Sequence, residues 1–283
     1  MSKKIIITGT KGLLGSSLVK FYKDKGYKVH DNYFNVTNPL STENLIKEFR
    51  PDYFINTAAK SFISDNNKDF ISINVSPVFY QLDAISKYSP DCLYINCGST
   101  AEFNEDSLYG VGKAAARHIV NYYKNKGLKA FQPYLNNFTG NNQNEKFLIP
   151  KIIKGLNKEK PIKVGCVVSL KSFLWVDDVV SALDFILQNP LNENVVISSD
   201  NFYFIYEIIQ KIFKTNGTEC FWDEDKTVLL DYKFNILVQV DESLVRDEKI
   251  GKIHTERAIQ DFGWSPVNSF NDIIEKMLIK NNS

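Results

Sequence analysis

The 283-residue sequence has little of several features that mark particular classes of protein. Its four cysteines include no C-x-x-C pair, which favours a reduced, cytoplasmic protein without a structural zinc site. Lysine and arginine total 34 against 33 acidic residues, so we expect no nucleic-acid partner. No apolar run approaches the roughly 20 residues that span a bilayer, and we expect no membrane association. The basic N-terminus lacks a small-residue cleavage site and is expected to form a first strand rather than a signal peptide.

Arginine and histidine are also scarce. The chain has four arginines, so any anion site must use mainly lysines and backbone N–H groups. The three histidines, His30, His118 and His254, lie far apart and none has a second ligand at metal spacing. We therefore expect no metal site.

Short apolar runs alternate with amphipathic stretches in the first half of the chain. The apolar runs are 4–7, 27–30, 53–56, 93–96 and 129–131, and the helical stretches are 13–25, 45–49, 77–87 and 109–126. Ser41 is expected to cap the second helix, which Pro51 ends. Strands that are apolar on both faces and alternate with helices predict a parallel sheet covered on both sides. The fold class is therefore α/β, a Rossmann-type doubly wound sheet.

The pattern changes after about residue 135. An Asn-rich segment, 136–144, precedes expected helices at 149–156, 176–188, 205–214 and 269–280 and a short strand at 162–164. We expect residues 1–135 to form a dinucleotide-binding domain. Residues 136–283 should form mostly a smaller substrate-binding lobe, with segments that return to the first domain.

A glycine-rich turn follows the first strand and opens the first helix. Gly9, Gly12 and Gly15 permit a tight turn and a close approach of the backbone to a pyrophosphate, which the helix N-terminus would face. The cofactor-binding residues expected here are Gly9, Lys11, Gly12, Leu13, Leu14 and Gly15.

Asp31 follows the second strand, 22 residues after Gly9 (31 − 9). A carboxylate there can hydrogen-bond an adenosine ribose, which favours NADH, although Asp31 could equally be a solvated turn residue. Lys11 could instead attract the 2′-phosphate of NADPH. Because the two residues favour different cofactors, we expect NADPH or NADH to serve, with Lys11 as the 2′-phosphate partner.

Tyr109 and Lys113 are the most informative pair. They are four residues apart on an expected helix, so both side chains can reach one substrate. A neighbouring ammonium lowers the pKa of a tyrosine toward working pH and makes it a usable proton donor. The preceding strand ends in Cys97-Gly98-Ser99-Thr100, which places hydroxyl groups at the carboxyl edge of the sheet.

These motifs together resemble the extended short-chain dehydrogenase/reductase family (the NAD-dependent epimerase/dehydratase family) over essentially the whole chain. The matching segments are Thr8-Gly9-x-x-Gly12-x-x-Gly15, Asn56-Thr57-Ala58-Ala59, Ser99-Thr100 and Tyr109-x-x-x-Lys113. Segments 137–140, 171–178 and 262–266 are similar to those of GDP-4-keto-6-deoxymannose reductases and GDP-mannose dehydratases. The compact segment 95–109 looks more like that of CDP-paratose and CDP-abequose synthases.

The resemblance implies a role for each matching residue. Tyr109 would donate a proton to the sugar O4, and Lys113 would hold the nicotinamide ribose and lower the tyrosine pKa. Thr100, with Ser99 as the alternative, would hydrogen-bond the reacting carbonyl. The segment Ala58, Ala59 and Lys60 would contact the cofactor, and Asn137, Lys171 and Arg246 would contact the substrate, the two cations at its diphosphate. Lys171 stands where the family usually has arginine, and it supplies charge without the bidentate geometry of arginine.

The implied function is an NAD(P)H-dependent reductase of a GDP- or CDP-linked 4-keto-6-deoxy sugar, which supplies a deoxysugar for surface polysaccharide. The implied assembly is a homodimer packed through helices 77–87 and 109–126, with Val78, Phe79, Leu82, Ile85, Ile119, Val120 and Tyr123 as apolar stripes that could equally cover the sheet. Two alternatives stay open. The first is a 4,6-dehydratase or an epimerase, because Glu102, two residues after Thr100, has the spacing of a dehydratase acid–base group and could contact substrate. The other is a catalytically silent dinucleotide-binding protein.

Overall fold

The computed structural model describes residues 2–32, 34–61, 69–103, 107–158, 160–191, 193–244 and 258–281. The chain divides into two compact units. The first unit comprises 1–136, 179–197 and 256–265, and the second comprises 137–178, 198–255 and 266–283.

The first unit is built on a five-stranded sheet in which all neighbouring strands are parallel. Its order is β2 (Lys28–His30), β1 (Lys4–Ile7), β3 (Tyr53–Asn56), β4 (Leu93–Asn96) and β5 (Ala130–Phe131). The central strands are buried on both faces because helices cover both sides of the sheet. This confirms the predicted Rossmann-type α/β fold.

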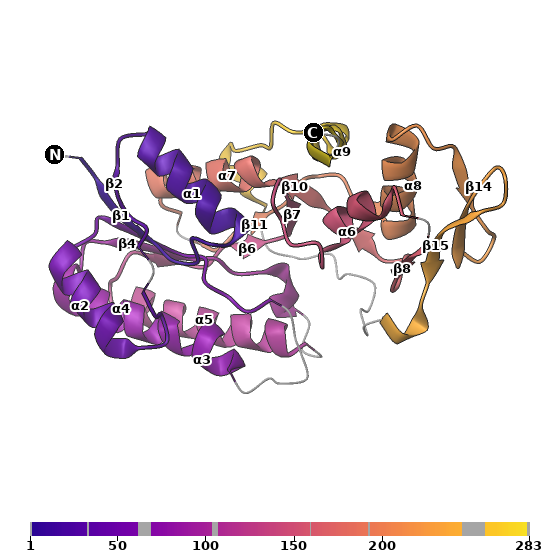
Figure 1. The fold of residues 1–283 in the computed structure, drawn as a ribbon. Coiled ribbons are helices and arrows are strands. Elements are labelled where there is room, and N and C mark those ends of the chain that lie inside the picture. Colours follow the sequence, from indigo (N-terminus) through magenta and orange to yellow (C-terminus); the bar gives the residue numbers. More distant parts are fainter. Residues whose placement is uncertain are drawn as a thin grey trace. The chain divides into compact units, whose positions relative to one another are not determined.

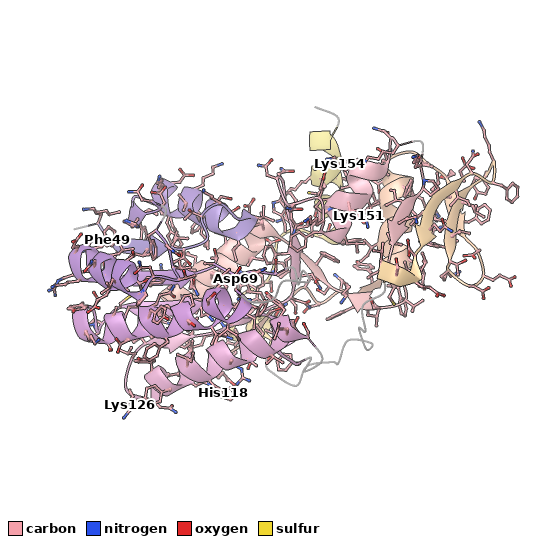
Figure 2. The ribbon with its side chains drawn as sticks, turned by 60° about the horizontal axis from the view of Figure 1, so that its bottom comes forward. Phe49, Asp69, His118, Lys126, Lys151 and Lys154 are labelled. Carbon is pink, nitrogen blue, oxygen red and sulfur yellow. The ribbon has the colours of Figure 1, made fainter. Side chains whose placement is uncertain are left out.

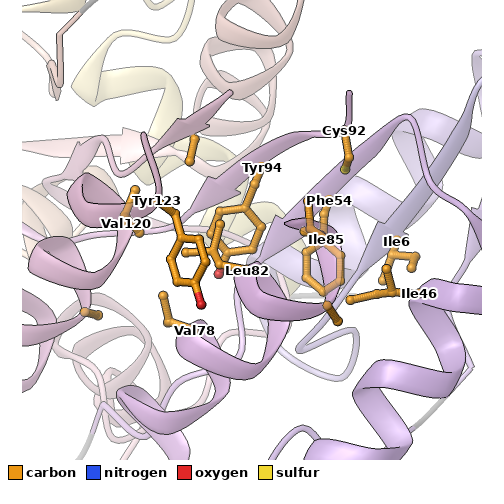
Figure 3. Packing of buried hydrophobic residues seen from close by; sticks show 13 residues of the cluster. Ile6, Ile46, Phe54, Val78, Leu82, Ile85, Cys92, Tyr94, Val120 and Tyr123 are labelled. Carbon is orange, nitrogen blue, oxygen red and sulfur yellow. The ribbon is translucent and has the colours of Figure 1, made fainter. Parts of the chain in front are cut away.

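Helices α1 (Leu13–Asp24) and α7 (Val176–Gln188) lie above the sheet in Figure 1, and α2 (Pro39–Phe49), α4 (Ser76–Tyr88) and α5 (Leu108–Asn125) lie below it. The short helix α3 (Phe70–Asn74) precedes α4. A large hydrophobic cluster fills the space between the sheet and the lower helices (Figure 3). Phe54 and Tyr94 contribute to it from the strands, and Leu82 and Val120 contribute from the helices.

The start of α2 differs from the sequence prediction. The helix begins at Pro39, and the side chain of Asn38 accepts a hydrogen bond from the Ser41 N–H at 3.1 Å. Asn38 is thus the N-cap and Ser41 lies inside the first turn. Proline at the first helical position, with its φ already set for a helix, explains why the helix starts here.

The two apolar stripes predicted for a dimer interface mostly face inward. Val78, Leu82, Ile85 and Val120 are at most 1% exposed and belong to the core beneath the sheet. The outer surface of the same helices instead carries Phe79, which is 47% exposed, and Val111 and Tyr122, which are 45% and 57% exposed. The stripes therefore cover the sheet, and only Phe79 among the predicted α4 residues is well exposed.

The second unit combines short strand pairs, a four-stranded sheet and helices. Strand β7 (Asn137–Thr139) pairs with β10 (Phe173–Trp175), and β9 (Leu170–Lys171) pairs with β12 (Tyr203–Phe204). The four-stranded sheet has the order β13 (Cys220–Trp222), β14 (Val228–Asp231), β15 (Ile236–Val240) and β8 (Ile162–Val164). The helices are α6 (Leu148–Gly155), α8 (Ile205–Thr215) and α9 (Phe270–Asn281). Within the described residues, no helix is long and apolar enough to span a membrane.

Candidate active site

The glycine loop between β1 and α1 is tightly packed. Gly9 has a φ of +67°, a left-handed conformation that favours glycine, and a Cβ there would lie 2.8 Å from the Ala58 backbone nitrogen. The Gly12 N–H donates to the Gly9 carbonyl at 2.9 Å and closes the turn. A Cβ on Gly15 would collide with the same carbonyl. Each of the three glycines therefore has a packing or conformational role in this turn.

The N-terminus of α1 suits an anion. Gly12 is its N-cap, and no side chain caps this end of the helix. The first N–H groups of a helix lack intrahelical partners and attract negative charge. Gly12 is exposed, and a Cβ there would lie 3.2 Å from the Gly9 carbonyl oxygen. These features fit the pyrophosphate of a dinucleotide cofactor, with Leu13 and Leu14 in the first turn and Lys11 exposed in the loop.

Asp31 lies beside the glycine loop, as its position after β2 requires. The Thr10 hydroxyl donates to the Asp31 backbone carbonyl at 3.5 Å. The Asp31 carboxylate also forms an ion pair of 2.8 Å with Lys23, near the end of α1. Lys23 was not singled out in the sequence, although it lies eight residues before Asp31. Its ammonium offsets the negative charge that would otherwise repel a 2′-phosphate.

The segment that follows β3 is held by buried side chains. The Thr8 hydroxyl oxygen accepts the N–H groups of Thr57 and Ala58, both at 3.2 Å. Asn74, which is 4% exposed, accepts the Lys60 N–H at 2.7 Å and donates to the Lys60 carbonyl at 3.0 Å. The Ala58 N–H is thus hydrogen-bonded within the protein, whereas the neighbouring Ala59 is exposed. The structure fixes this segment next to the glycine loop.

Tyr109 and Lys113 share one face of α5, as their spacing predicts. Ser107 caps the helix by accepting the Gly110 N–H at 3.3 Å. Lys113 is 5% exposed, and its ammonium donates to the Cys97 carbonyl at 2.6 Å. The ammonium nitrogen lies 5.8 Å from the centre of the Tyr109 ring. The end of β4 therefore anchors the lysine beside the tyrosine.

Phe70 of α3 packs against the Tyr109 ring. The two rings meet edge to face, with centroids 6.4 Å apart and an interplanar angle of 85°. Phe70 is fully buried, and a Cβ on Gly112 would lie 2.6 Å from its ring. The glycine at position 112 thus makes room for the aromatic ring that supports the tyrosine. Sequence reasoning missed Phe70, because nothing local links it to a helix almost forty residues away.

The turn after β4 presents the two predicted hydroxyl groups. Ser99 and Thr100 are both half-buried, and the Ser99 hydroxyl oxygen accepts the Ala101 N–H at 3.1 Å. Thr100 begins the short 3-10 helix η1 (Thr100–Phe103). Burial raises the pKa of the neighbouring Cys97 thiol to about 12, which keeps it protonated and unreactive.

Glu102 lies inside the protein rather than at its surface. Its side chain is 0% exposed and forms an ion pair of 3.0 Å with Arg117, one helical turn beyond Lys113 on α5. Burial raises the pKa of the Glu102 carboxyl, and its hydrogen bonds to Ser99, Gln132 and Arg117 act in the opposite direction. Sequence reasoning assigned Glu102 to the substrate, but its carboxylate is enclosed by protein groups.

The second unit brings Asn137 and Lys171 onto neighbouring segments. Asn137 in β7 pairs with Phe173 in β10, and its side-chain amide donates to the Ser172 carbonyl at 3.3 Å. Lys171 directly precedes Ser172 and is half-buried. Arg246, the other predicted diphosphate partner, lies outside the described residues.

The described part of the chain contains no group of three or more His, Cys, Asp or Glu side chains that could hold a metal ion. His118 lies on the exposed side of α5 (Figure 2).

Comparison with known structures first shows which proteins share the fold. Over 98% of its length, the chain superposes with a TM-score of 0.80 on 96% of dTDP-glucose 4,6-dehydratase from Bacillus anthracis in complex with NAD, at 21% identity. It also covers 98% of GDP-mannoheptose C4 reductase from Campylobacter jejuni with NADP bound, with 99% of its own length, a TM-score of 0.74 and 18% identity. Both likenesses show the Rossmann-like fold of NAD(P)-binding nucleotide-sugar enzymes.

The family follows from the sequence comparison. The model of the GDP-mannose 4,6 dehydratase family matches residues 32–277, and the chain belongs to this family. It is 28% identical over 232 residues to GDP-6-deoxy-D-talose 4-dehydrogenase of Aggregatibacter actinomycetemcomitans, covering 73% of this chain and 78% of that one. It is 24% identical over 276 residues to CDP-abequose synthase of Yersinia pseudotuberculosis, covering 85% and 96%. These relatives thus include one enzyme named for a GDP-linked sugar and one named for a CDP-linked sugar.

Proposed function

We propose that the protein is an NAD(P)H-dependent reductase that converts the C4 ketone of a GDP- or CDP-linked 4-keto-6-deoxy sugar to an alcohol. The observation that carries this proposal is the Tyr109–Lys113 pair, whose ammonium is held at 2.6 Å by the Cys97 carbonyl beside the tyrosine. A protein that only bound a dinucleotide could use the lysine but would not need a tyrosine beside it. The pair therefore favours an enzyme over a catalytically silent binding protein.

The cofactor proposed is NADPH or NADH. Gly9, Gly12 and the N-terminus of α1 would bind the pyrophosphate, and Lys113 would bind the nicotinamide ribose. When bound, the reduced nicotinamide supplies the hydride for the ketone carbon. Lys11 and Lys23 would favour a 2′-phosphate, whereas Asp31 would favour a free ribose. Because Lys23 pairs with Asp31, we expect the site to accept both cofactors.

The proton proposed for the sugar O4 comes from the Tyr109 hydroxyl. The Lys113 ammonium stabilises the phenolate that remains, since opposite charges attract more strongly where water is excluded. Thr100, or Ser99 in its place, would donate a hydrogen bond to the same oxygen and stabilise its developing charge. These residues come from the end of β4 and the first turns of α5, which are hydrogen-bonded to each other through Lys113.

The substrate contacts proposed for the second unit are Asn137 and Lys171, with Arg246 as a further cation. A diphosphate requires donors and positive charge, which a lysine ammonium supplies without the bidentate geometry of arginine. The names of the GDP-6-deoxy-D-talose and CDP-abequose relatives support a GDP or CDP substrate. The product would then be a deoxysugar for surface polysaccharide, made in the cytoplasm by a homodimer.

A 4,6-dehydratase is the second candidate, because the matching family model carries that description and Glu102 follows Thr100 at the corresponding spacing. The two reactions differ in their use of the cofactor. A reductase consumes NAD(P)H stoichiometrically, whereas a dehydratase returns its cofactor to the starting state and needs no ketone in the substrate.

The test supplies the purified protein with NADPH or NADH and GDP- or CDP-4-keto-6-deoxy sugars, in parallel with GDP-mannose. The proposal expects oxidation of the reduced nicotinamide only with the keto sugars. Formation of a 4-keto sugar from GDP-mannose would identify a dehydratase instead. If no sugar nucleotide reacted while the cofactor still bound, the protein would be a binding protein.

A further inference from the structure

A line of buried polar side chains crosses the carboxyl edge of the five-stranded sheet. One lies just after β1, one ends β3, one ends β4, one follows β5, and the last is in η1. In this order they are Thr8, Asn56, Asn96, Gln132 and Glu102, which we call the amide chain. They are between 0 and 7% exposed. Such buried polar groups are stable only when their hydrogen bonds are complete.

The hydrogen bonds of the amide chain all run in one direction. The Thr8 oxygen already accepts the Thr57 and Ala58 N–H groups, so its own hydrogen must go to the Asn56 carbonyl, at 2.5 Å. The Asn56 amide can then only donate, and it does so to the Asn96 carbonyl at 2.7 Å. The backbone contacts of Thr8 thus fix the orientation of the carboxamides that follow.

The same direction continues to Glu102. Asn96 donates to the Gln132 carbonyl at 2.5 Å, and Gln132 donates to a Glu102 oxygen at 2.8 Å. The Ser99 N–H donates to that oxygen at 3.1 Å, and Arg117 donates to the other oxygen at 3.0 Å. An amide chain that ends in donors needs an acceptor at its end. The ionised carboxylate, which is acceptor-only, accepts all three of these donors and has no proton of its own that would need a further acceptor.

The end of the amide chain contacts both segments that carry the candidate catalytic residues, the helix α5 and the turn after β4. The Gln132 amide also donates to the Lys113 backbone carbonyl at 2.8 Å, and the Ser99 N–H belongs to the turn that carries Thr100. Glu102 is packed tightly against the turn after β4, because a Cβ on Gly98 would lie 2.7 Å from a Glu102 oxygen. A movement of Glu102 would therefore shift the hydroxyl turn and the lysine together.

We propose that Glu102 is a positioning residue: as a buried carboxylate held by Ser99, Gln132 and Arg117, it fixes the Ser99–Thr100 turn relative to Lys113 and exchanges no proton with the substrate. This inference rests on the proposed reductase function and deepens it. A Glu102 without an acid–base role leaves the chain able to reduce a ketone but not to remove water from a sugar through that carboxylate.

The test compares Glu102→Gln with the double variant Glu102→Gln, Arg117→Gln. In the single variant the new amide group turns a donor toward the Arg117 donor, and the pair repels. In the double variant the amide can donate to the new glutamine carbonyl, which restores a neutral hydrogen bond. We expect the single variant to lower kcat by about 10-fold or more with KM within about 2-fold, and the double variant to recover kcat to within about 3-fold of wild type.

A group that exchanged protons with the substrate would behave differently. Neither variant has a carboxyl at position 102, so the double variant would stay as slow as the single one, and this result would overturn the proposal. The pH profile gives a second readout. Burial raises the pKa of the Glu102 carboxyl, Arg117 is the charged partner that faces it, and Ser99 and Gln132 meet it with neutral N–H groups. The kcat of the wild type should fall on acidification through that raised pKa, and the double variant should lack this acidic limb.

The ion pair between Lys25 and Asp184 provides a matched control. It joins the end of α1 to α7 at 2.6 Å, with side chains 39% and 14% exposed, away from the carboxyl edge of the sheet. Asp184→Asn should lower the melting temperature and leave kcat unchanged. If it lowered kcat as much as Glu102→Gln, the effect at Glu102 would be general destabilisation and the proposal would fail.

The positioning role of Glu102 can be tested even if the proposed reductase function is wrong. If the wild type oxidised NADPH with no keto sugar, the reductase assignment would fail. The positioning role would then be judged on NADPH affinity, because Lys113 would hold the ribose. Weaker NADPH binding in Glu102→Gln that the double variant restores would support it, and equal affinity in wild type and Glu102→Gln would contradict it. Conversion of GDP-mannose by the wild type but not by the double variant would contradict it as well.

Discussion

Gly112→Ala tests how closely Phe70 packs between Gly112 and the Tyr109 ring. A methyl group at this position would lie 2.6 Å from the Phe70 ring, about 1 Å short of an ordinary van der Waals contact. Phe70 is fully buried, so its ring can yield only by displacing its neighbours. Overpacking of this kind costs about 1–3 kcal/mol, whereas alanine in place of glycine within a helix gains about 1 kcal/mol. We expect a net loss of about 1 kcal/mol in the free energy of unfolding.

The effect on turnover should be larger than the effect on stability. The Phe70 ring meets Tyr109 edge to face, so a shift of the first ring moves the second. A misplacement of about 1 Å at a reacting group can lower a rate by up to about 10²-fold. Urea unfolding measures the first effect, and steady-state kinetics with a keto sugar nucleotide measures the second.

Phe70→Leu supplies the control, because leucine leaves room for the methyl group. The double variant Gly112→Ala, Phe70→Leu should be no less stable than Phe70→Leu alone, which makes the two substitutions strongly non-additive. The reasoning would be refuted if Gly112→Ala raised stability by the full helix-propensity gain and kept wild-type kcat. That result would mean that the Phe70 ring does not occupy the space beside Gly112.

Three further predictions concern the cofactor, the assembly and the nucleotide. Lys11→Ala should weaken the binding of NADPH more than that of NADH in fluorescence titrations; a preference for NADH above about 100-fold that survives the substitution would exclude Lys11 as the 2′-phosphate partner. Light scattering should give a homodimer, and Phe79→Glu with Tyr122→Glu should give a monomer, since charge on exposed apolar helix surfaces opposes burial. Free GDP or CDP should raise the melting temperature, with GDP slightly favoured, and Lys171→Ala should reduce that shift without affecting NADPH binding; an undiminished shift would place the diphosphate elsewhere.

The parallel sheet and the glycine loop could be predicted because their signals are local. Strands such as Lys4–Ile7 and Leu93–Asn96 are short apolar runs, and the chain between them shows helical periodicity. Tyr109 and Lys113 share a helix face by spacing alone. Arg117 continues the same spacing by one more turn and could have been found by extending it.

The rest depends on contacts between distant segments. Glu102 meets Gln132 across thirty positions, and Lys60 meets Asn74 across fourteen, so no local pattern reports either contact. The strand-final asparagines, Asn56 and Asn96, gave the one usable signal, because a polar residue that ends a buried strand needs a partner. The four-stranded sheet of the second unit was predicted only at β8, expected at 162–164, and its other three strands were missed for another reason. Those three strands, between 220 and 240, are short and separated by polar turns, and the Asp223 carboxylate closes one turn by accepting the Thr227 and Val228 N–H groups.

The decisive measurement of the reductase function follows the absorbance of the reduced nicotinamide while wild type and Tyr109→Phe react with GDP- and CDP-4-keto-6-deoxy sugars. We expect the wild type to oxidise the cofactor in an amount equal to the keto sugar reduced. Tyr109→Phe should bind the cofactor with nearly unchanged affinity and show kcat lowered by about 10²–10⁴-fold, the scale for losing a general acid. Near-full turnover by Tyr109→Phe would contradict the role of Tyr109 as proton donor, and an absence of oxidation with any keto sugar would contradict the reductase function itself.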